Sequence, residues 1–219
     1  MTNAFALFSA LDPTAQAELN ALLQIDSYPA GHLFHTSNET GRHVFFLQQG
    51  RVRIYKLSPE GRALTLLVLN PPSLFGEMAL IGAGVHDTCA EAMTDCIAAR
   101  IDREALRAFL SRQPKAAIEL MELMGARLRL MEQRLADIAF KSVPQRLAAL
   151  LLDLAGDPTD ETAPATLVRY THQQLAEMIG AYRETVTKAL GDMREANLIR
   201  IADDAIILVD PVQLRRLAS

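Results

Sequence analysis

Cysteine is scarce in this sequence, and its scarcity limits the chemistry that the chain can support. The 219 residues include two cysteines, Cys89 and Cys96, and no tryptophan. Zinc sites and iron–sulfur clusters usually need about four protein ligands, so these two thiols are too few to form one. We therefore expect no iron–sulfur centre, and we expect both thiols to be small buried side chains rather than a disulfide.

Long apolar segments are missing as well. No stretch reaches the roughly 18 consecutive apolar residues of a membrane-spanning helix. The opening MTNAFALFSALDPTAQAELNALL is amphipathic and lacks the basic start of a signal peptide. With 50% hydrophobic and 22% charged residues, the composition is typical of a folded soluble protein. We expect a cytoplasmic protein without membrane contact.

An excess of positive charge is the third absence. The chain has 22 Lys and Arg against 26 Asp and Glu, a formal charge of −4. Residues 141–219 alone contain nine basic and eleven acidic residues. Because nucleic-acid affinity depends on the charge near the binding face, this balance does not exclude DNA binding. It does mean that such binding must depend on well-placed contacts more than on bulk attraction.

The first half of the chain has the pattern of an antiparallel barrel or sandwich. After an expected helix over 13–23, short strand-like runs alternate with Gly and Pro breaks. The expected strands are 44–48, 51–57, 63–69 and two more within 87–101, joined near Thr94 and Asp95. A short helix follows, with Asp102 as its N-cap and Pro114 as its end. We expect residues 1–116 to form this sensor-like β domain.

A heptad pattern fills the middle of the chain and predicts one long helix over 117–140. Apolar residues recur there at alternating intervals of three and four, which is the spacing of a coiled-coil seam. The seam residues are Met121, Met124, Leu128, Met131, Leu135 and Ile138. The helix can pack on its own domain, and Leu120, Leu123 and Leu130 widen the stripe in that direction. The narrow seam and its charged flanks favour a dimerisation helix.

Residues 141–219 have the outline of a winged helix-turn-helix. A helix is expected from Pro144, then a polar loop over 157–166, then helices over 172–179 and 183–196. Two short strands, LIRIA and AIILV, follow and are joined by Asp203 and Asp204. This order of elements predicts a DNA-binding domain.

The helix pair contains the small and apolar residues that such a motif requires. Ala176 lies where the second helix crosses the first, and Gly180 can take the positive φ of the turn. The apolar contacts between the helices are expected from Leu175, Ile179, Ala181, Val186 and Leu190. Tyr182 stands where a Ser or Thr cap is usual, and its ring can lie on a phosphate or on the preceding helix.

Polar side chains on the second helix are expected to point away from this apolar contact. They are Arg183, Glu184, Thr187 and Lys188. Arg suits a two-pronged hydrogen bond to guanine, and Glu can accept from cytosine. The adjacent Arg183 and Glu184 are then explained by adjacent base pairs, because neighbouring helix residues do not face each other. The alternative is a helical hairpin whose charged face is merely solvated.

With these motifs, the whole chain resembles the Crp/Fnr family of bacterial transcription regulators. The resemblance rests on FGEMAL at 75–80, on QQLAEMIGAYRETVTKAL at 173–190 and on the order of barrel, long helix and winged helix. It implies an α+β fold with a jelly-roll domain similar to cyclic-nucleotide-binding domains. It also implies a homodimer that binds palindromic double-stranded DNA and contacts RNA polymerase. Arg183, Glu184 and Lys188 match the family's base-reading positions, and Thr171 and Gln173 match its backbone-contacting positions.

The expected effector pocket departs from the family's cyclic-AMP pattern. Gly76 and Glu77 are present, but the Arg-Ser pair that holds the cyclic phosphate is matched by His86 and Asp87. The two adenine-binding positions on the long helix are matched by Met131 and Glu132. A mostly neutral imidazole and a carboxylate do not hold a phosphate well. We therefore expect no cyclic AMP in its usual pose.

Other family cofactors find no support in the sequence. The N-terminal cysteine cluster of the family's oxygen sensors is absent, and spacing assigns no histidine as a haem ligand. His32, His35, His43, His86 and His172 are expected to be structural or exposed.

The prediction is a homodimeric transcription regulator, active without a small ligand or with one other than cyclic AMP. The alternative is a cyclic-nucleotide-binding regulatory or scaffold module without DNA binding. No nucleophile–base motif, phosphate loop or metal cluster suggests an enzyme.

Overall fold

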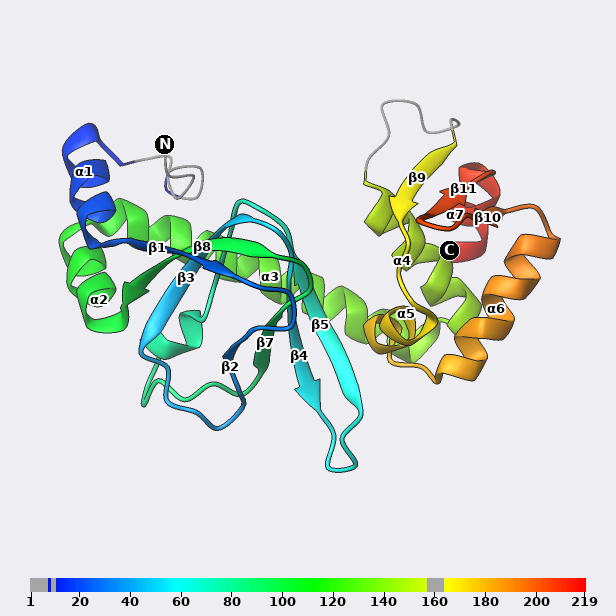
Figure 1. The fold of residues 1–219 in the computed structure, drawn as a ribbon, viewed down its shortest axis with the longest axis horizontal. Coiled ribbons are helices and arrows are strands. Elements are labelled where there is room, and N and C mark those ends of the chain that lie inside the picture. Colours follow the sequence, from blue (N-terminus) through cyan, green and yellow to red (C-terminus); the bar gives the residue numbers. More distant parts are fainter. Residues whose placement is uncertain (1–7, 9–10, 157–163) are drawn as a thin grey trace. The chain divides into compact units, whose positions relative to one another are not determined.

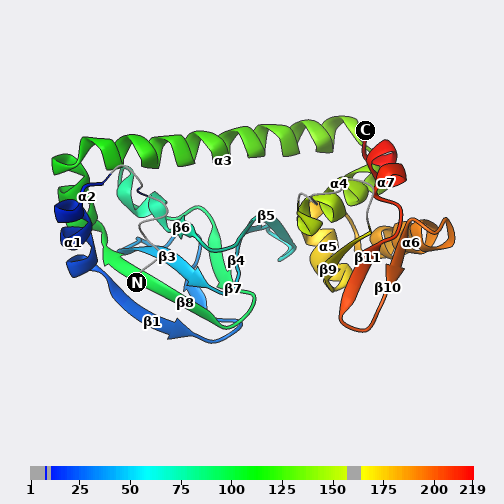
Figure 2. The same cartoon turned by 90° about the horizontal axis from the view of Figure 1, so that it is seen from above.

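The computed structural model describes Phe8, residues 11–156 and residues 164–219 (Figure 1). The chain divides into two compact units, Met1–Leu130 and Met131–Ser219. The division falls within α3 (Pro114–Phe140), which is one continuous helix (Figure 2). The predicted helix began three residues later, at 117. The earlier start is explained by Pro114, because proline is well tolerated in the first turn of a helix.

The first unit is a jelly roll of two four-stranded antiparallel sheets, with strand orders β1-β8-β3-β6 and β2-β7-β4-β5. The first sheet contains β1 (Gln24–Tyr28), β3 (His43–Gln49), β6 (Ser73–Phe75) and β8 (Cys96–Asp102). The second contains β2 (Leu33–His35), β4 (Val52–Leu57), β5 (Ala63–Leu69) and β7 (Cys89–Ala92). The predicted α+β fold class and its strands are confirmed. The sequence reading missed β1, β2 and β6, which are short.

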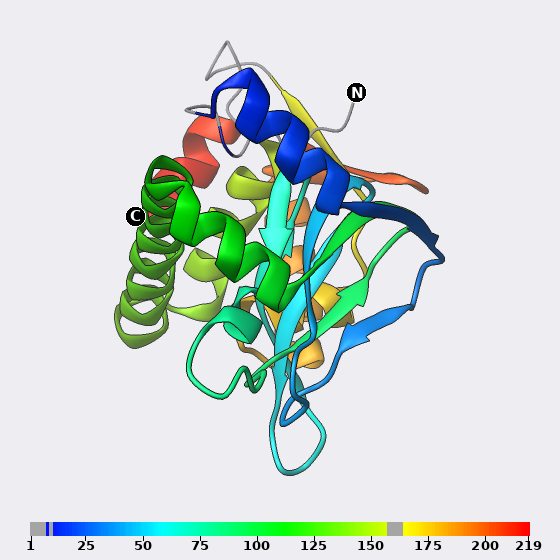
Figure 3. The same cartoon turned by 90° about the vertical axis from the view of Figure 1, so that its left-hand side faces the viewer.

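Two helices lie side by side at one end of these sheets (Figure 3). They are α1 (Pro13–Leu22), whose start is capped by Asp12, and α2 (Arg103–Arg112), whose start is capped by Asp102. The Asp102 carboxylate accepts bonds from the amides of Glu104 and Ala105, at 2.8 and 3.2 Å, as its expected N-cap role requires. α2 ends at Arg112, just before Pro114, as predicted.

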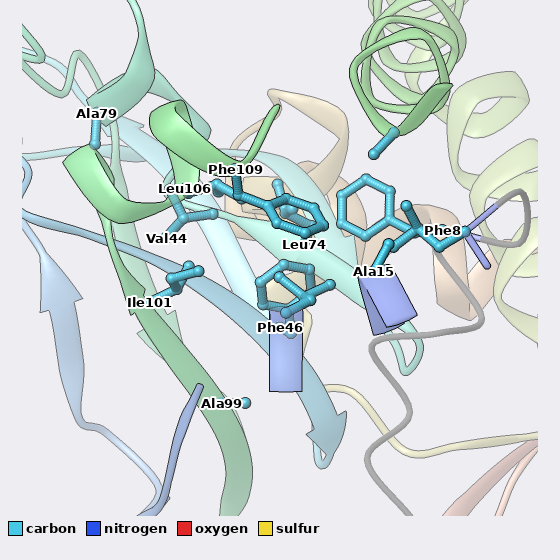
Figure 4. Packing of buried hydrophobic residues seen from close by; sticks show 13 residues of the cluster. Phe8, Ala15, Val44, Phe46, Leu74, Ala79, Ala99, Ile101, Leu106 and Phe109 are labelled. Carbon is cyan, nitrogen blue, oxygen red and sulfur yellow. The ribbon is translucent and has the colours of Figure 1, made fainter. Parts of the chain in front are cut away.

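The helices and the first sheet share one apolar core (Figure 4). Phe46 of β3 and Phe109 of α2 are fully buried in it, and the Phe8 ring packs edge-on against Phe46 with centroids 6.0 Å apart. Ala116 at the start of α3 is buried in the same cluster, and Leu120 and Leu123 pack against it. One face of α3 is therefore part of the core of the first unit.

The two cysteines are free and buried, as expected. Cys96 lies in the other apolar cluster of the jelly roll, together with Phe45 and Phe75. Burial raises the pKa of the Cys96 thiol, so it remains protonated at neutral pH.

The second unit is a winged helix-turn-helix built on α4 (Val143–Ala155). The helices are α5 (His172–Ile179), α6 (Arg183–Glu195) and α7 (Pro211–Ala218). The strands are β9 (Ala165–Val168), β10 (Ile199–Ile201) and β11 (Ala205–Leu208), in the order β10-β11-β9. The predicted helices and wing strands are confirmed. The sequence reading missed α7 and β9; β9 takes two residues of the expected 157–166 loop, of which 157–163 lie outside the described residues.

Candidate nucleic-acid interface and sensor pocket

The turn between α5 and α6 has the geometry that the sequence predicted. Gly180 ends α5 with φ 63° and ψ 45°, the left-handed conformation that favours glycine. Of the predicted contact residues, Leu175, Ile179, Val186 and Leu190 are buried and Ala181 is half-buried; Ala176, at the expected crossing point, is buried too. The apolar contact fixes α6 against α5, so the opposite face of α6 has a defined orientation.

That opposite face carries the predicted base-reading side chains. Arg183, Glu184, Thr187 and Lys188 are all exposed. They lie in the first two turns of α6, on the side away from the buried Val186 and Leu190. A cation and a carboxylate thus stand next to each other at the start of an exposed helix, where each can form hydrogen bonds to another molecule.

The starts of α5 and α6 are capped differently. Thr171 forms a capping box: its hydroxyl accepts from the Gln174 amide at 3.1 Å, and its own amide donates to Gln174 Oε1 at 2.9 Å. The structure gives α6 no side-chain cap, because Tyr182 at that position makes no capping bond. The Tyr182 side chain is 63% exposed instead. This agrees with the expectation that Tyr182 is a poorer cap than Ser or Thr.

Two further contacts involve side chains in the first turn of α5. The Gln173 amide donates to Glu177 Oε1 at 2.9 Å, along the surface of the helix. His172 Nδ1 lies 2.8 Å from the Thr187 hydroxyl, so a side chain at the start of α5 reaches a side chain on α6. The sequence reading gave His172 only a structural or exposed role and did not connect it to Thr187. Residues 15 positions apart carry no local signal for such a contact.

The wing of the second unit has an acidic tip. β10 and β11 pair antiparallel, and the exposed Asp203 and Asp204 join them. Arg169 donates from Nη1 to the carbonyls of Ala202 and Asp203, at 3.2 and 3.0 Å. These bonds tie the turn to the end of β9.

In the first unit, the predicted pocket residue Glu77 is paired with Arg127 of α3. Gly76 precedes it with φ 79°, and Glu77 begins the short 3-10 helix η2 (Glu77–Leu80). Glu77 Oε2 and Arg127 Nη1 are 3.1 Å apart, and their side chains are only 19% and 14% exposed. Arg127 also donates to the Leu74 carbonyl. The sequence reading placed Arg127 on the charged flank of the seam and missed this pairing.

His86, a predicted pocket residue, is an interior side chain. It is 2% exposed and stacks on His35, with ring centroids 3.7 Å apart and an interplanar angle of 11°. His35 Nδ1 lies 3.0 Å from the Thr88 carbonyl. A Cβ atom at Gly41 would lie 2.3 Å from His86 Nε2, so only glycine fits beside this ring. The two rings are therefore packed against each other and against Gly41 in the interior of the jelly roll.

Both rings of this stack are held neutral. Burial, reinforced by the neighbouring His86, lowers the pKa of His35 from 6.5 to about 4. Burial also lowers the pKa of His86. The Nδ1 atom of His86 is buried and has no hydrogen-bond partner, which leaves an added proton there without an acceptor.

The other predicted pocket residues are Asp87, Met131 and Glu132. Asp87 forms an ion pair with Lys56 of β4, with Oδ2 and Nζ 3.1 Å apart, and both side chains are about half exposed. Met131 and Glu132 belong to the second unit. A cavity of about 150 Å³ does open in the jelly roll, and His86 is the one predicted pocket residue on its wall. The wall consists of Phe34, His35, Glu39, Thr40, Gly41, Arg42, His43, Phe45 and His86.

The predicted seam residues of α3 are mostly uncovered. Met121, Leu128, Leu135 and Ile138 are exposed, Leu128 by 61% and Leu135 by 68%. Met124 and Met131 are half-buried. The exposed residues recur at seam spacing, while Ala116, Leu120 and Leu123 lie on the face that packs on the core. α3 thus has two apolar faces, one covered and one open.

Within Phe8, 11–156 and 164–219, no three His, Cys, Asp or Glu side chains are grouped so as to hold a metal ion. No helix in the described part of the chain is both long and apolar enough to cross a membrane.

Two family models match the two units. Residues 25–113 match the cyclic nucleotide-binding domain, and residues 145–217 match the Crp-like helix-turn-helix domain.

Relatives match over almost the full chain. A CRP-like cAMP-activated global transcriptional regulator from Mycobacterium tuberculosis is 32% identical and is covered over 96% of its length by 97% of this chain. A global nitrogen regulator from Synechococcus elongatus is 28% identical, with 88% of each chain covered. A CRP/FNR-family transcriptional regulator from Thermus thermophilus superposes with a TM-score of 0.72 at 28% identity, over 89% of this chain and 98% of that one.

Proposed function

Since the chain belongs to the Crp/Fnr family of transcription regulators, we propose that it acts as a homodimer that binds palindromic promoter sites through α6. One observation carries the proposal. The apolar contact between α5 and α6 is buried, and the opposite face of α6 exposes Arg183, Glu184, Thr187 and Lys188. We place this activity in the cytoplasm, with RNA polymerase as a further partner.

Each exposed side chain has a role that its chemistry suggests. Arg183 offers a planar fork to the O6 and N7 atoms of guanine, and Glu184 accepts from the amino group of cytosine. Lys188 supplies a point charge and discriminates its base less sharply than Arg would. Thr171, Gln173 and Tyr182 flank this set and suit contacts to phosphates, which orient the protein without reading sequence.

Selection of binding sites from random DNA tests the assignment. The wild type should select a palindrome with half-sites about one helical turn apart, related to TGTGA. Arg183→Ala should reduce the free energy of DNA binding by roughly 1–3 kcal/mol and weaken the base preference at one position of each half-site. Lys188→Ala should have a smaller effect on base preference. If neither variant changed the selected motif, the assigned face would be wrong.

The dimer is proposed to form through the open face of α3. Four exposed apolar side chains at seam spacing are costly in water and pack well against the same seam of a second helix. Leu128→Glu should give monomers by light scattering and abolish DNA binding, because a charge in the seam costs several kcal/mol. Ala126→Glu, at an exposed position on the opposite side of the heptad, is the matched control and should remain dimeric. A dimeric Leu128→Glu would contradict the proposal.

Control by cyclic AMP in its usual pose is not part of the proposal. His86 is stacked on His35, Asp87 pairs with Lys56, and Glu77 pairs with Arg127, so none of the three is arranged to receive a phosphate. Calorimetry with cyclic AMP should therefore show no heat of binding at micromolar protein. Micromolar affinity with tighter DNA binding would overturn this part, and cyclic-nucleotide binding without any DNA binding would favour the scaffold alternative.

A further inference from the structure

The contact between His172 and Thr187 joins the two helices on their DNA-facing side. His172 is the first residue of α5, and Thr187 lies on the exposed face of α6 between Glu184 and Lys188. The 2.8 Å separation of Nδ1 and Oγ1 is a normal hydrogen bond between these groups. His172 therefore takes one hydrogen-bonding position of the Thr187 hydroxyl and directs that hydroxyl toward α5.

A threonine side chain has only two groups beyond Cβ, a hydroxyl and a methyl. Since the hydroxyl is directed toward α5, the methyl is the group left to face what α6 meets. Two neighbours on the same exposed face, Glu184 and Lys188, are proposed above to meet base edges. The Thr187 side chain would then present its methyl group to the major groove.

We propose that His172 fixes the Thr187 hydroxyl so that the Thr187 methyl contacts a thymine methyl and specifies one A·T pair in each half-site. The inference rests on the proposed DNA binding through α6. Thymine alone presents a methyl group in the major groove, and an apolar side-chain group is its fitting partner. A free hydroxyl would select less, because it can both donate and accept and so suits several base edges.

Two single substitutions separate the methyl from the hydroxyl. Thr187→Val keeps the shape and the methyl but removes the hydroxyl, and Thr187→Ser keeps the hydroxyl but removes the methyl. In binding-site selection, wild type and Thr187→Val should share a preference for thymine at one position. Thr187→Ser should lose that preference and keep the rest of the motif.

Replacing that thymine by uracil sharpens the test, because uracil lacks only the methyl group. Affinity of wild type and of Thr187→Val should fall about fourfold on this replacement, as expected for uncovering one methyl group. Affinity of Thr187→Ser should not change. If Thr187→Ser kept the thymine preference and Thr187→Val lost it, the hydroxyl would be the reading group and the inference would be wrong.

The positioning role of His172 is tested by a double-mutant cycle. His172→Ala frees the hydroxyl and should relax the thymine preference in the wild-type background. In the Thr187→Val background there is no hydroxyl to hold, so the same substitution should leave the thymine-to-uracil ratio unchanged. An equal effect in both backgrounds would mean that His172 acts on the DNA directly. If the wild type selected no palindrome at all, the proposed function itself would fail, which is a different result from a palindrome insensitive to Thr187.

Discussion

The jelly roll and the α6 face use polar side chains in opposite ways. In the jelly roll, Glu77 pairs with Arg127 and His35 stacks on His86, and all four side chains are largely buried. On α6, Arg183, Glu184 and Lys188 are exposed over a buried apolar layer. In the first region these side chains contact one another, and in the second they are exposed.

This difference separates two kinds of inference from a family pattern. Where the matching residues remain exposed on a fixed helix, as on α6, their chemistry is still available to a ligand. Around Glu77 and His86, the matching side chains contact other side chains of the protein. Their polar groups are then less available to a ligand. The α6 face therefore supports the DNA binding proposed above, and the contacts around Glu77 and His86 support the proposal that cyclic AMP does not bind in its usual pose.

The largest expected effect comes from breaking the buried ion pair. Glu77→Gln leaves the Arg127 guanidinium mostly buried without a carboxylate and should destabilise the protein by about 3 kcal/mol. The bond from Arg127 to the Leu74 carbonyl keeps the loss at the low end for such pairs. Thermal unfolding at fixed protein concentration measures it.

Asp26→Asn is the matched control for that measurement. Asp26 and Arg100 are 3.3 Å apart, but their side chains are 47% and 40% exposed, so the loss should stay below about 1 kcal/mol. Equal losses for Glu77→Gln and Asp26→Asn would remove the contrast between buried and exposed polar groups.

The stacked histidines should make the first unit sensitive to acid. The folded-state pKa of His35 is about 4, against 6.5 when unfolded, so the unfolded chain binds more protons between these values. Stability is therefore complete above pH 6.5 and falls as the pH drops toward 4, by roughly 2 kcal/mol at pH 5. The lowered pKa of His86 acts in the same direction. The nearby carboxylates of Glu39 and Asp87 oppose the shift of His35 without cancelling it.

Urea unfolding at pH 7 and pH 5 measures this loss. His35→Asn, which cannot titrate, should flatten the difference between the two pH values. An equally steep profile in His35→Asn would show that the stack is not its source.

The sequence predicted the elements whose signals are local. Heptad spacing located α3, Gly180 located the turn, and Asp102 located the start of α2, because each signal lies within a few residues of its effect. The short edge strand β1 was missed because four of its five residues are exposed and show no alternation. Periodicity cannot indicate a strand that buries so little.

The sequence was enough to name residues of the candidate site, but it did not indicate which of them contact one another. The exposed face of α6 follows from helix geometry, so Arg183 and Lys188 could be placed from spacing alone. The pairing of Glu77 with Arg127 spans 50 positions, and the stacking of His35 on His86 spans 51. Such contacts depend on how the strands fold back on one another, which no local pattern encodes.

The smallest expected effect concerns Tyr182 and sharpens the comparison within the second unit itself. α5 has a capping box at Thr171, whereas Tyr182 gives α6 no capping bond. Tyr182→Ser should supply one and raise stability by roughly 0.5–1 kcal/mol, while Thr171→Ala should lower it by a similar amount. If the exposed ring lies on a phosphate, Tyr182→Ser should also weaken binding to all DNA sequences alike, because phosphate contacts do not read bases. Thermal unfolding and fluorescence polarisation with matched and scrambled palindromes separate the two effects. A more stable Tyr182→Ser protein with unchanged DNA affinity would show that the tyrosine at this position has no part in recognition.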